Sequence, residues 1–143
     1  MKIRRGQLKD AKELFKTINQ TKELRSSEKR QTYSLKWIRA VITSKNTDKV
    51  LICEENNKII GFLIAYISKK KGYSYLSDFY VHPNHRRKGI ATKLYKEYEK
   101  NCKKLKTKRI TSLVMTTNKK MQNWCKKHNF KRGNKFYVFE KSL

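Results

Sequence analysis

The sequence is poor in the residues that interrupt or cross-link a chain. Its 143 residues include only five glycines, one proline and three cysteines. So little glycine and proline excludes a collagen-like chain and a proline-rich linker. Cys53, Cys102 and Cys125 are odd in number, far apart and form no CxxC pair, which argues against a disulfide framework or a zinc site. This use of cysteine is typical of a reducing cytoplasm, and we expect no bound metal.

Long apolar runs and acidic residues are also scarce. No stretch of about 18 apolar residues is present, so no membrane span is expected. No apolar segment follows residues 1–5, so we expect no secretory signal. Hydrophobic residues nonetheless make up 37% of the chain, with eight tyrosines and two tryptophans. This is enough for one core, and the length predicts a single domain over residues 1–143.

The shortage of acidic side chains leaves a strong positive charge. The 37 lysines and arginines outnumber the 11 aspartates and glutamates, and the formal net charge is +26. Such a charge favours polyanionic partners such as nucleic acid, acidic proteins or phosphorylated cofactors. A compositional origin is the alternative, because lysine dominates, is spread over every segment and is favoured by an AT-rich coding sequence. The charge alone leaves both interpretations open.

Hydrophobic periodicity predicts an alternation of helices and strands. Four segments with helical spacing are predicted to be helices: 8–18, 35–42, 89–105 and 118–128. Six short apolar runs predict strands: 3–4, 50–53, 59–67, 73–81, 110–115 and 136–139. Asn56 and Asn57 indicate a hairpin turn, and the polar segment 20–31 is expected to be a loop or an exposed helix. The order predicts a mixed α/β, or α+β, domain around one sheet.

The most informative stretch joins the strand that ends at Val81 to the helix that begins after Gly89. Pro83 ends the strand, and residues 86–88 form a basic loop. A strand, a loop and a helix N-terminus make an anion site, since free backbone N–H groups point outward and the helix dipole adds positive charge. Gly89 permits close approach of a phosphate. The stretch predicts a pyrophosphate site; a basic turn before an ordinary amphipathic helix is the alternative.

Three parts of the chain together match one known pattern. Residues 79–91 combine a strand end with an R-x-x-G-x-A motif, residues 118–130 begin with Asn and end in HNF, and 136–141 form an apolar strand pattern. These parts resemble the GNAT superfamily of acetyl-CoA-dependent N-acetyltransferases, and 86–94 is most similar to the branch that acetylates protein N-termini. The resemblance covers essentially the whole chain. It implies the GNAT fold, with about four helices and a mixed sheet whose strands at 73–81 and 110–115 splay apart.

The resemblance implies acetyl-CoA as the cofactor and a set of residues around it. In the family the pantetheine arm lies between the two splayed strands, where Phe79, Tyr80 and Val81 would offer backbone groups. The Val81 amide would polarise the thioester carbonyl, and Asn118 would bond near the pantetheine arm. The residues implied at the pyrophosphate are Arg86, Arg87, Lys88, Gly89, Ile90, Ala91 and Thr92.

The sequence departs from the family at the groups that move protons. Cys125 stands where the family often has a tyrosine that protonates the leaving thiolate. A thiol of pKa about 8.5 matches that leaving group, so Cys125 is a candidate acid, with a buried apolar side chain as the alternative. The segment 111–117 has no carboxylate, and Asp78 on the preceding strand is the candidate base, with a salt bridge as its alternative role. Tyr75 and Tyr80 are weaker candidates.

Three functions fit these residues. The preferred one is acetyl transfer from acetyl-CoA to a protein N-terminus or lysine by direct attack of the amine on the thioester. The second keeps fold and cofactor but acetylates a nucleic-acid-linked amine, such as aminoacyl-tRNA, or a small metabolite. The third is a non-catalytic module that binds CoA or nucleic acid, as the missing tyrosine and carboxylate suggest. In the family the segments corresponding to 20–31 and 131–135 select the acceptor; both are basic here, which favours an acidic acceptor.

Overall fold

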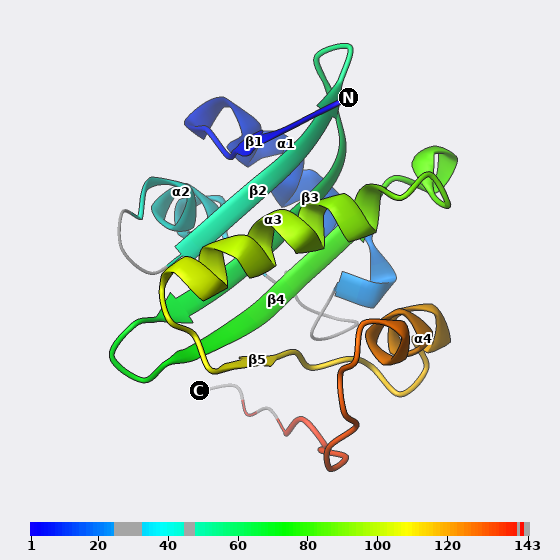
Figure 1. Ribbon diagram of the computed structural model, residues 1–143. Helices are drawn as coiled ribbons and strands as arrows, with labels where there is room; N and C mark the ends of the chain where they lie inside the picture. The colour runs from blue at the N-terminus through cyan, green and yellow to red at the C-terminus, as the bar shows by residue number, and fades with distance from the viewer. Residues whose placement is uncertain (25–32, 45–47, 140, 142–143) are drawn as a thin grey trace. The chain divides into compact units, whose positions relative to one another are not determined.

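The computed structural model describes residues 1–24, 33–44, 48–139 and 141. The chain forms two compact units, Met1–Leu113 and Val114–Leu143. The first unit holds the sheet and three α-helices, and the second holds one α-helix, α4 (Lys119–Lys127) (Figure 1). Most of the segment 20–31, expected to be a loop or an exposed helix, lies outside the described residues; its beginning contains a short 3-10 helix, η2 (Lys22–Leu24).

A five-stranded mixed sheet forms the centre of the first unit. Its strands lie in chain order: β1 (Lys2–Arg5), β2 (Asp48–Glu55), β3 (Lys58–Ser68), β4 (Tyr73–Val81) and β5 (Arg109–Thr111). Neighbouring strands are antiparallel except β4 and β5, which are parallel. Asn56 and Asn57 both adopt positive φ and make the tight turn between β2 and β3. The predicted mixed sheet and its hairpin are confirmed.

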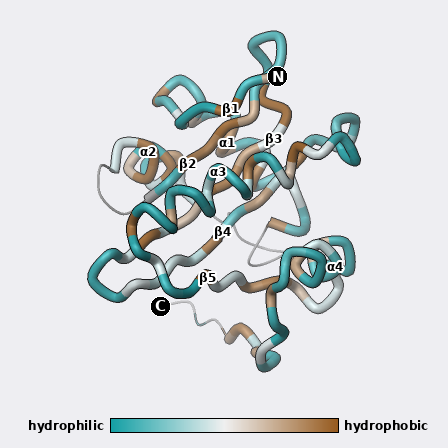
Figure 2. The backbone as a smooth tube through the Cα atoms, in the orientation of Figure 1, coloured by the Kyte–Doolittle hydropathy of each residue, from teal (hydrophilic) through white to brown (hydrophobic). Residues whose placement is uncertain are grey.

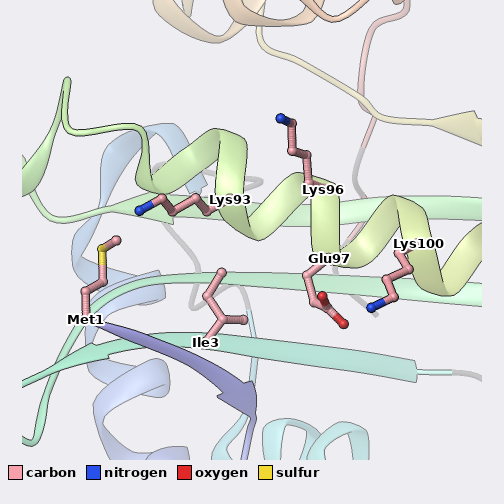
Figure 3. A pocket seen from close by; sticks show the side chains of 6 residues that line it. All are labelled: Met1, Ile3, Lys93, Lys96, Glu97 and Lys100. Atoms are coloured by element: carbon pink, nitrogen blue, oxygen red, sulfur yellow. The ribbon is translucent and has the colours of Figure 1, made fainter.

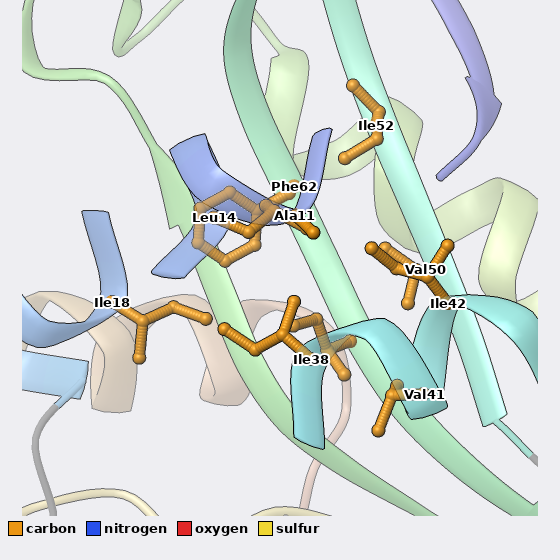
Figure 4. Close-up of a cluster of buried hydrophobic side chains, with 10 residues drawn as sticks. Ala11, Leu14, Ile18, Ile38, Val41, Ile42, Val50, Ile52 and Phe62 are labelled. Atoms are coloured by element: carbon orange, nitrogen blue, oxygen red, sulfur yellow. The ribbon is translucent and has the colours of Figure 1, made fainter. Parts of the chain in front are cut away.

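Helices cover both faces of this sheet. The helices α1 (Ala11–Gln20) and α2 (Leu35–Thr43) lie on one face, and α3 (Ile90–Lys104) crosses the other (Figure 1). Apolar side chains of α1 and α2 meet those of β2 and β3 in one cluster (Figure 4): Ala11, Leu14, Ile18, Ile38, Val41, Ile42, Val50, Ile52, Phe62 and Ile64. Hydrophobic residues follow the central strands, whereas the turns are hydrophilic (Figure 2). None of the described helices is long and apolar enough to cross a membrane.

The strand β4 has a neighbour on both sides over only part of its length. β5 pairs with residues 73–75 alone, and the Ser112 hydroxyl then donates to the Leu76 carbonyl at 2.9 Å. Beyond this point no strand among the described residues pairs with that edge of β4. The predicted separation of the two strands is therefore confirmed.

Two strand predictions near the C-terminal end are wrong. The strand predicted at 110–115 is only Arg109–Thr111, and Leu113 and Met115 are exposed. The segment 136–139 forms no strand, and its four large apolar side chains are 74 to 92% exposed. An apolar run becomes a strand only where a neighbouring strand takes up its backbone hydrogen bonds. The described residues provide no such neighbour for either segment.

Candidate active site

The loop after β4 turns twice before α3 begins. The His82 N–H donates to the Ile60 carbonyl at 2.9 Å, and a short 3-10 helix, η3 (Pro83–His85), follows. Arg87 and Gly89 then adopt positive φ angles of 63° and 74°. Gly89 takes this conformation freely, whereas Arg87 is strained in it because a Cβ disfavours it. Strain of this kind tends to persist where a backbone path serves a function.

This backbone path leaves a row of N–H groups without partners. Within the described residues, the amides from Arg87 to Thr92 make no hydrogen bond, and the first bond of α3 runs from the Lys93 N–H to the Gly89 carbonyl. Gly89 is the N-cap and brings no side chain to occupy these amides. A Cβ placed on it would meet nothing within 4 Å, so the space beside it is open. With the dipole of α3, this row can bind the phosphates of a ligand.

Three cations surround the row of amides. Arg86, Arg87 and Lys88 are all exposed. The Arg86 Nε donates to the Val81 carbonyl at 3.0 Å, which ties the loop back to the end of β4. Within the first turn of α3, Ile90 is buried and anchors the helix, whereas the next two residues, predicted with it, are half-buried. Charge and free amides thus occur together at the start of α3.

A glycine in β3 holds the start of α3 close to the end of β4. A Cβ on Gly61 would lie 2.9 Å from the Tyr80 carbonyl oxygen and 3.3 Å from the Ile90 side chain. In the sheet, Gly61 is the register partner of Val81. The start of α3 therefore packs against β3 next to the end of β4. Sequence reasoning missed Gly61, although a glycine inside an apolar strand is a signal of close backbone approach.

The last three residues of β4 were predicted to lie along the cofactor. Phe79, Tyr80 and Val81 are half-buried and pair with β3 on one side. The Tyr80 ring stacks on Phe62, with ring centres 5.3 Å apart, so this side chain packs in the core. In an antiparallel ladder alternate residues point to opposite edges. Because the His82 N–H bonds to the Ile60 carbonyl, the backbone groups of Tyr80 point to β3 and those of Val81 point to the edge that β5 leaves open.

A β-bulge decides which way Asp78 faces. The register between β3 and β4 shifts after Ile64, so that Ser77 has no partner of its own. Ser74 hydrogen-bonds with Tyr98 of α3, whereas Asp78 pairs with Ile64, a member of the cluster under α1 and α2. Residues four apart on a regular strand share one face. The bulge instead places Ser74 and Asp78 on opposite faces.

Asp78 is a buried carboxylate, and none of the groups that shift its pKa is a cation. Its side chain is 2% exposed, and its Oδ2 has no hydrogen-bond partner among the described residues. Burial raises the pKa of Asp78 to about 6, while hydrogen bonds from Ser77 and Tyr33 act in the opposite direction. A carboxylate with this pKa gains and loses a proton near neutral pH, as a general base must.

The second unit carries the two remaining predicted residues. Asn118 is the N-cap of α4, and its Oδ1 accepts the Met121 N–H at 3.1 Å, so its side-chain NH₂ is the part left for a ligand. Cys125 is half-buried, and burial raises the pKa of its thiol. This thiol therefore keeps its proton at neutral pH.

Most of the predicted residues thus lie in the first unit, where Asp78, residues 79–81 and the loop at 86–92 follow one another along β4 and into α3. Asn118 and Cys125 belong to the second unit. Sequence reasoning missed Tyr33, which hydrogen-bonds to Asp78. The bulge that turns Asp78 toward it leaves no mark in the periodicity of the sequence.

A hollow of about 440 Å³ lies beside α3 and β1 and contains none of these residues (Figure 3). Its lining combines three lysines of α3 with one carboxylate and two apolar side chains: Met1, Ile3, Lys93, Lys96, Glu97 and Lys100. Because Glu97 offsets part of the lysine charge, we assign this hollow no role in the site.

Comparison with solved structures identifies the fold. An aminoglycoside antibiotic 6'-N-acetyltransferase from Acinetobacter haemolyticus has a TM-score of 0.78 at 20% identity, with 100% of this chain and 99% of that chain covered. A ribosomal-protein-alanine N-acetyltransferase from Brucella melitensis biovar Abortus 2308 has a TM-score of 0.74 at 16% identity, with 98% of each chain covered. The PaiA N-acetyltransferase from Thermoplasma acidophilum, in complex with coenzyme A, has a TM-score of 0.78 at 21% identity, with 89% of this chain and 87% of that chain covered.

Comparison at the level of sequence identifies the family. No curated protein matches the chain. The model of the acetyltransferase (GNAT) family matches residues 11–130, which is most of the sequence and includes β4, the loop at 86–92 and α4. The free amides, the open strand edge and the buried carboxylate all lie inside the matched range. The chain therefore belongs to the GNAT family of acetyltransferases.

Proposed function

We propose that this acetyltransferase moves the acetyl group of acetyl-CoA to a primary amine of a protein, either an N-terminal α-amine or a lysine. Residues 1–143 act as one N-acetyltransferase domain. The observation that supports this most is the buried Asp78, with its pKa near neutrality, three residues before the end of the open strand edge. A structural carboxylate in a chain so rich in lysine would be expected to have a cationic partner.

The loop at 86–92 suits the phosphates of coenzyme A, because it combines unpaired amides, open space and positive charge. In the proposed site the residues that bind the pyrophosphate are Arg86, Arg87, Lys88, Gly89, Ile90, Ala91 and Thr92. The backbone of β4 at Phe79, Tyr80 and Val81 holds the pantetheine arm through its open edge, and Asn118 bonds near it. Bound acetyl-CoA supplies the activated thioester. The Val81 amide donates to its carbonyl oxygen, and a donor of this kind is typically worth about 3 kcal/mol.

Two side chains move protons in the proposed reaction. Asp78 takes a proton from the acceptor ammonium, so that a neutral amine attacks the thioester carbon, a C–N bond forms and the C–S bond breaks. Cys125 gives its proton to the leaving thiolate, and the second proton that the nitrogen loses as the amide forms restores the thiol. Because burial raises the pKa of Cys125, the thiol is protonated and ready to donate. Holding the amine and the thioester in line supplies much of the remaining acceleration.

The charge of the chain bears on the acceptor. At +26 the chain repels polycationic amines, including compounds of the aminoglycoside class named for some of its structural neighbours, and attracts acidic ones. A protein amine in an acidic context is therefore the proposed acceptor. The same charge favours a second candidate, an amine linked to nucleic acid such as aminoacyl-tRNA. The three free cysteines are consistent with the reducing cytoplasm as the place of action.

Mass spectrometry of an acceptor panel tests the proposed reaction. Acidic and basic peptides with free N-termini, aminoacyl-tRNA and an aminoglycoside are each incubated with acetyl-CoA and the full chain. We expect a gain of one acetyl group on peptides, faster on acidic than on basic ones. Acetylation confined to tRNA or to the aminoglycoside would rule out the protein acceptor, and no acetylation of any member would rule out the enzyme activity under these conditions.

Calorimetry with acetyl-CoA tests the phosphate loop separately. Gly89→Glu places a carboxylate beside the unpaired amides and should weaken binding by at least about tenfold, since it repels the phosphates and strains a positive φ. Gly133→Glu is the matched control, because a side chain there also meets nothing within 4 Å and adds the same charge to the second unit. Equal affinity of the two variants would contradict the assignment.

A further inference from the structure

Tyr33 joins the buried carboxylate to the surface of the first unit. Its hydroxyl hydrogen-bonds to Asp78. Its ring stacks on Trp37 of α2, with ring centres 3.9 Å apart and planes 16° from parallel. It also packs against the apolar cluster under α1 and α2. Trp37 is 37% exposed, so the Tyr33 ring lies between a surface tryptophan and a buried acid.

The two oxygens of Asp78 differ in their surroundings. Oδ2 is buried and has no hydrogen-bond partner among the described residues. Because Oδ2 has no partner, we place the Tyr33 hydrogen bond on Oδ1, while the Ser77 hydroxyl donates to the Ile64 carbonyl at 3.1 Å. A buried oxygen without a partner is costly, by roughly 1–3 kcal/mol or more for a charged group. Such an oxygen is retained most readily where a ligand completes its coordination.

We propose that Tyr33 is a positioning residue for Asp78. By donating to Oδ1 it fixes the orientation of the carboxylate and leaves Oδ2 as the oxygen that takes the proton of the acceptor ammonium, through a water because Oδ2 itself is buried. This inference rests on the proposed function, in which Asp78 is the base. Asp78 pairs with Ile64 and lies on the α1 and α2 side of the sheet, the side that carries the stacked pair of Tyr33 and Trp37.

The titratable groups around Asp78 are suited to this arrangement. Among the described residues, they are Tyr33, which precedes α2, and Tyr75 on β4 itself. Burial, followed by the charge of Asp78, raises the pKa of Tyr33 well above its ordinary value. Its hydroxyl consequently keeps its proton wherever Asp78 titrates, and remains a donor to both protonation states of the site.

Carbon-13 NMR of the full chain can follow Asp78 directly, without any acceptor. The sequence has only three aspartates, Asp10, Asp48 and Asp78, so labelling aspartate gives three side-chain carboxyl signals. The signal missing from Asp78→Asn identifies residue 78. In Tyr33→Phe its midpoint should move upward by about one pH unit, because the lost hydrogen bond favoured the ionised form.

Two further variants complete this experiment. Tyr75→Phe is the matched control: the charge of Asp78 raises the pKa of Tyr75, but the hydrogen bonds that act on Asp78 come from Ser77 and Tyr33, so the midpoint should move far less. Trp37→Leu keeps the Tyr33 hydroxyl but removes its stacking partner, and should move the midpoint in the same direction as Tyr33→Phe. It also keeps the inference testable if Tyr33→Phe does not fold.

The outcomes separate this inference from the proposed function. The positioning role would be overturned if the Asp78 midpoint were the same in the wild type and in Tyr33→Phe. If only Trp37→Leu folds, the same midpoint in that variant and in the wild type would overturn it. Neither outcome depends on the result of the acceptor panel. Once an acceptor is found, the limb of kcat/KM against pH near 6 should move upward in Tyr33→Phe by the same amount as the NMR midpoint. A limb that stays in place while the NMR midpoint moves would show that Asp78 is not the base, and would overturn both.

Discussion

Asp10 and Asp78 are both almost hidden from solvent, and their pKa values move in opposite directions. Asp10 is 5% exposed and Asp78 is 2% exposed. Burial raises the pKa of both, but at Asp10 the hydrogen bonds from Arg4 and from the Gln7 N–H outweigh burial, so that the pKa is lowered. At Asp78 the Tyr33 and Ser77 hydroxyls do not outweigh it, and the pKa rises to about 6.

The difference lies in the partners and in the depth of burial: both side chains have little exposed surface, but Asp78 lies deeper in the protein and is desolvated more strongly. Arg4 approaches Asp10 to 2.7 Å and also Glu54 to 2.6 Å, which forms a closed ion-pair network between β1, β2 and the start of α1. The groups that act on Asp78 are hydroxyls rather than a cation, and its Oδ2 has no hydrogen-bond partner among the described residues. A buried carboxylate with an arginine stabilises the fold in its charged form; one without a cation is held ready to take up a proton.

The largest expected effect comes from making Asp10 resemble Asp78. Arg4→Met removes the cation but keeps a side chain of similar length. It should lower the free energy of unfolding at pH 7 by about 3 kcal/mol, because the buried Asp10 loses the arginine that neutralises it. Urea unfolding followed by circular dichroism measures this.

Lys9→Met is the control for that variant. Lys9 is exposed and influences Asp10 only through its charge, so its loss should change the free energy of unfolding by about 0.5 kcal/mol or less. If Arg4→Met unfolds no more easily than Lys9→Met, the ion-pair network does not stabilise the fold. Asp10 would then not be the structural counterpart of Asp78.

The next effect is on catalysis. Asp78→Asn keeps the shape of the side chain but cannot accept the proton of the ammonium. We expect kcat/KM for acetyl transfer to fall by about a hundredfold or more, the usual contribution of a general base. The affinity for acetyl-CoA, measured by calorimetry, should stay the same, because Asp78 lies outside the phosphate loop. Activity within about threefold of the wild type would show that Asp78 is not the base.

The pH dependence of stability should follow from the same substitution. The pKa of Asp78 is about 6 in the folded state and about 3.9 in an unfolded chain, so the folded state binds this proton more tightly. The stabilisation is complete below about pH 4 and is lost as the pH rises through 6. Asp78→Asn avoids that loss and should be more stable than the wild type by about 3 kcal/mol at pH 8.

Measuring the free energy of unfolding of the wild type and of Asp78→Asn at pH 4 and at pH 8 isolates the contribution of Asp78, because every other titratable group is present in both proteins. The free energies of unfolding should be similar at pH 4 and differ at pH 8. A variant that is less stable than the wild type at pH 8 would mean that the ionised Asp78 is satisfied in the fold. If Asp78 is retained for its chemistry, Asp78→Asn should gain stability and lose activity together.

The smallest effect concerns Cys125, which is half-buried and has no charged partner among the groups that act on it. Cys125→Ala removes the proposed proton donor, and turnover at pH 7 should fall by about tenfold or less, because a thiolate leaves readily even without an acid. Cys102→Ala is not a suitable control, because Cys102 is fully buried. Cys125→Ser is used instead, since serine is close to cysteine in size. An unchanged turnover in Cys125→Ala would show that Cys125 is a packing residue and not the proton donor.

Much of the fold was predictable because its elements have strong local patterns. The stripes of α1, α2 and α3, the Asn56–Asn57 turn and the loop before Gly89 all depend on residues near in sequence. The strands β5 and 136–139 were predicted too long or wrongly, since a strand needs a partner that the local sequence does not specify.

The candidate site was predictable in part for the same reason. The amide row follows from a glycine before a helix. The roles of Arg4 and Tyr33 do not, because Arg4 meets Asp10 across a turn and Tyr33 reaches Asp78 across 45 positions. The bulge at Ser77 reverses the face that alternation predicts for Asp78. Long-range contacts of this kind decide whether a buried acid is structural or reactive.

The pH profile of kcat/KM for acetyl transfer, measured in the wild type and in Asp78→Asn, tests the central claim most directly. The wild type should gain activity as the pH rises through an apparent pKa near 6, the value to which burial raises the pKa of Asp78. Asp78→Asn should lack that limb and remain about a hundredfold less active on the plateau. The same limb near pH 6 in both proteins would contradict the account.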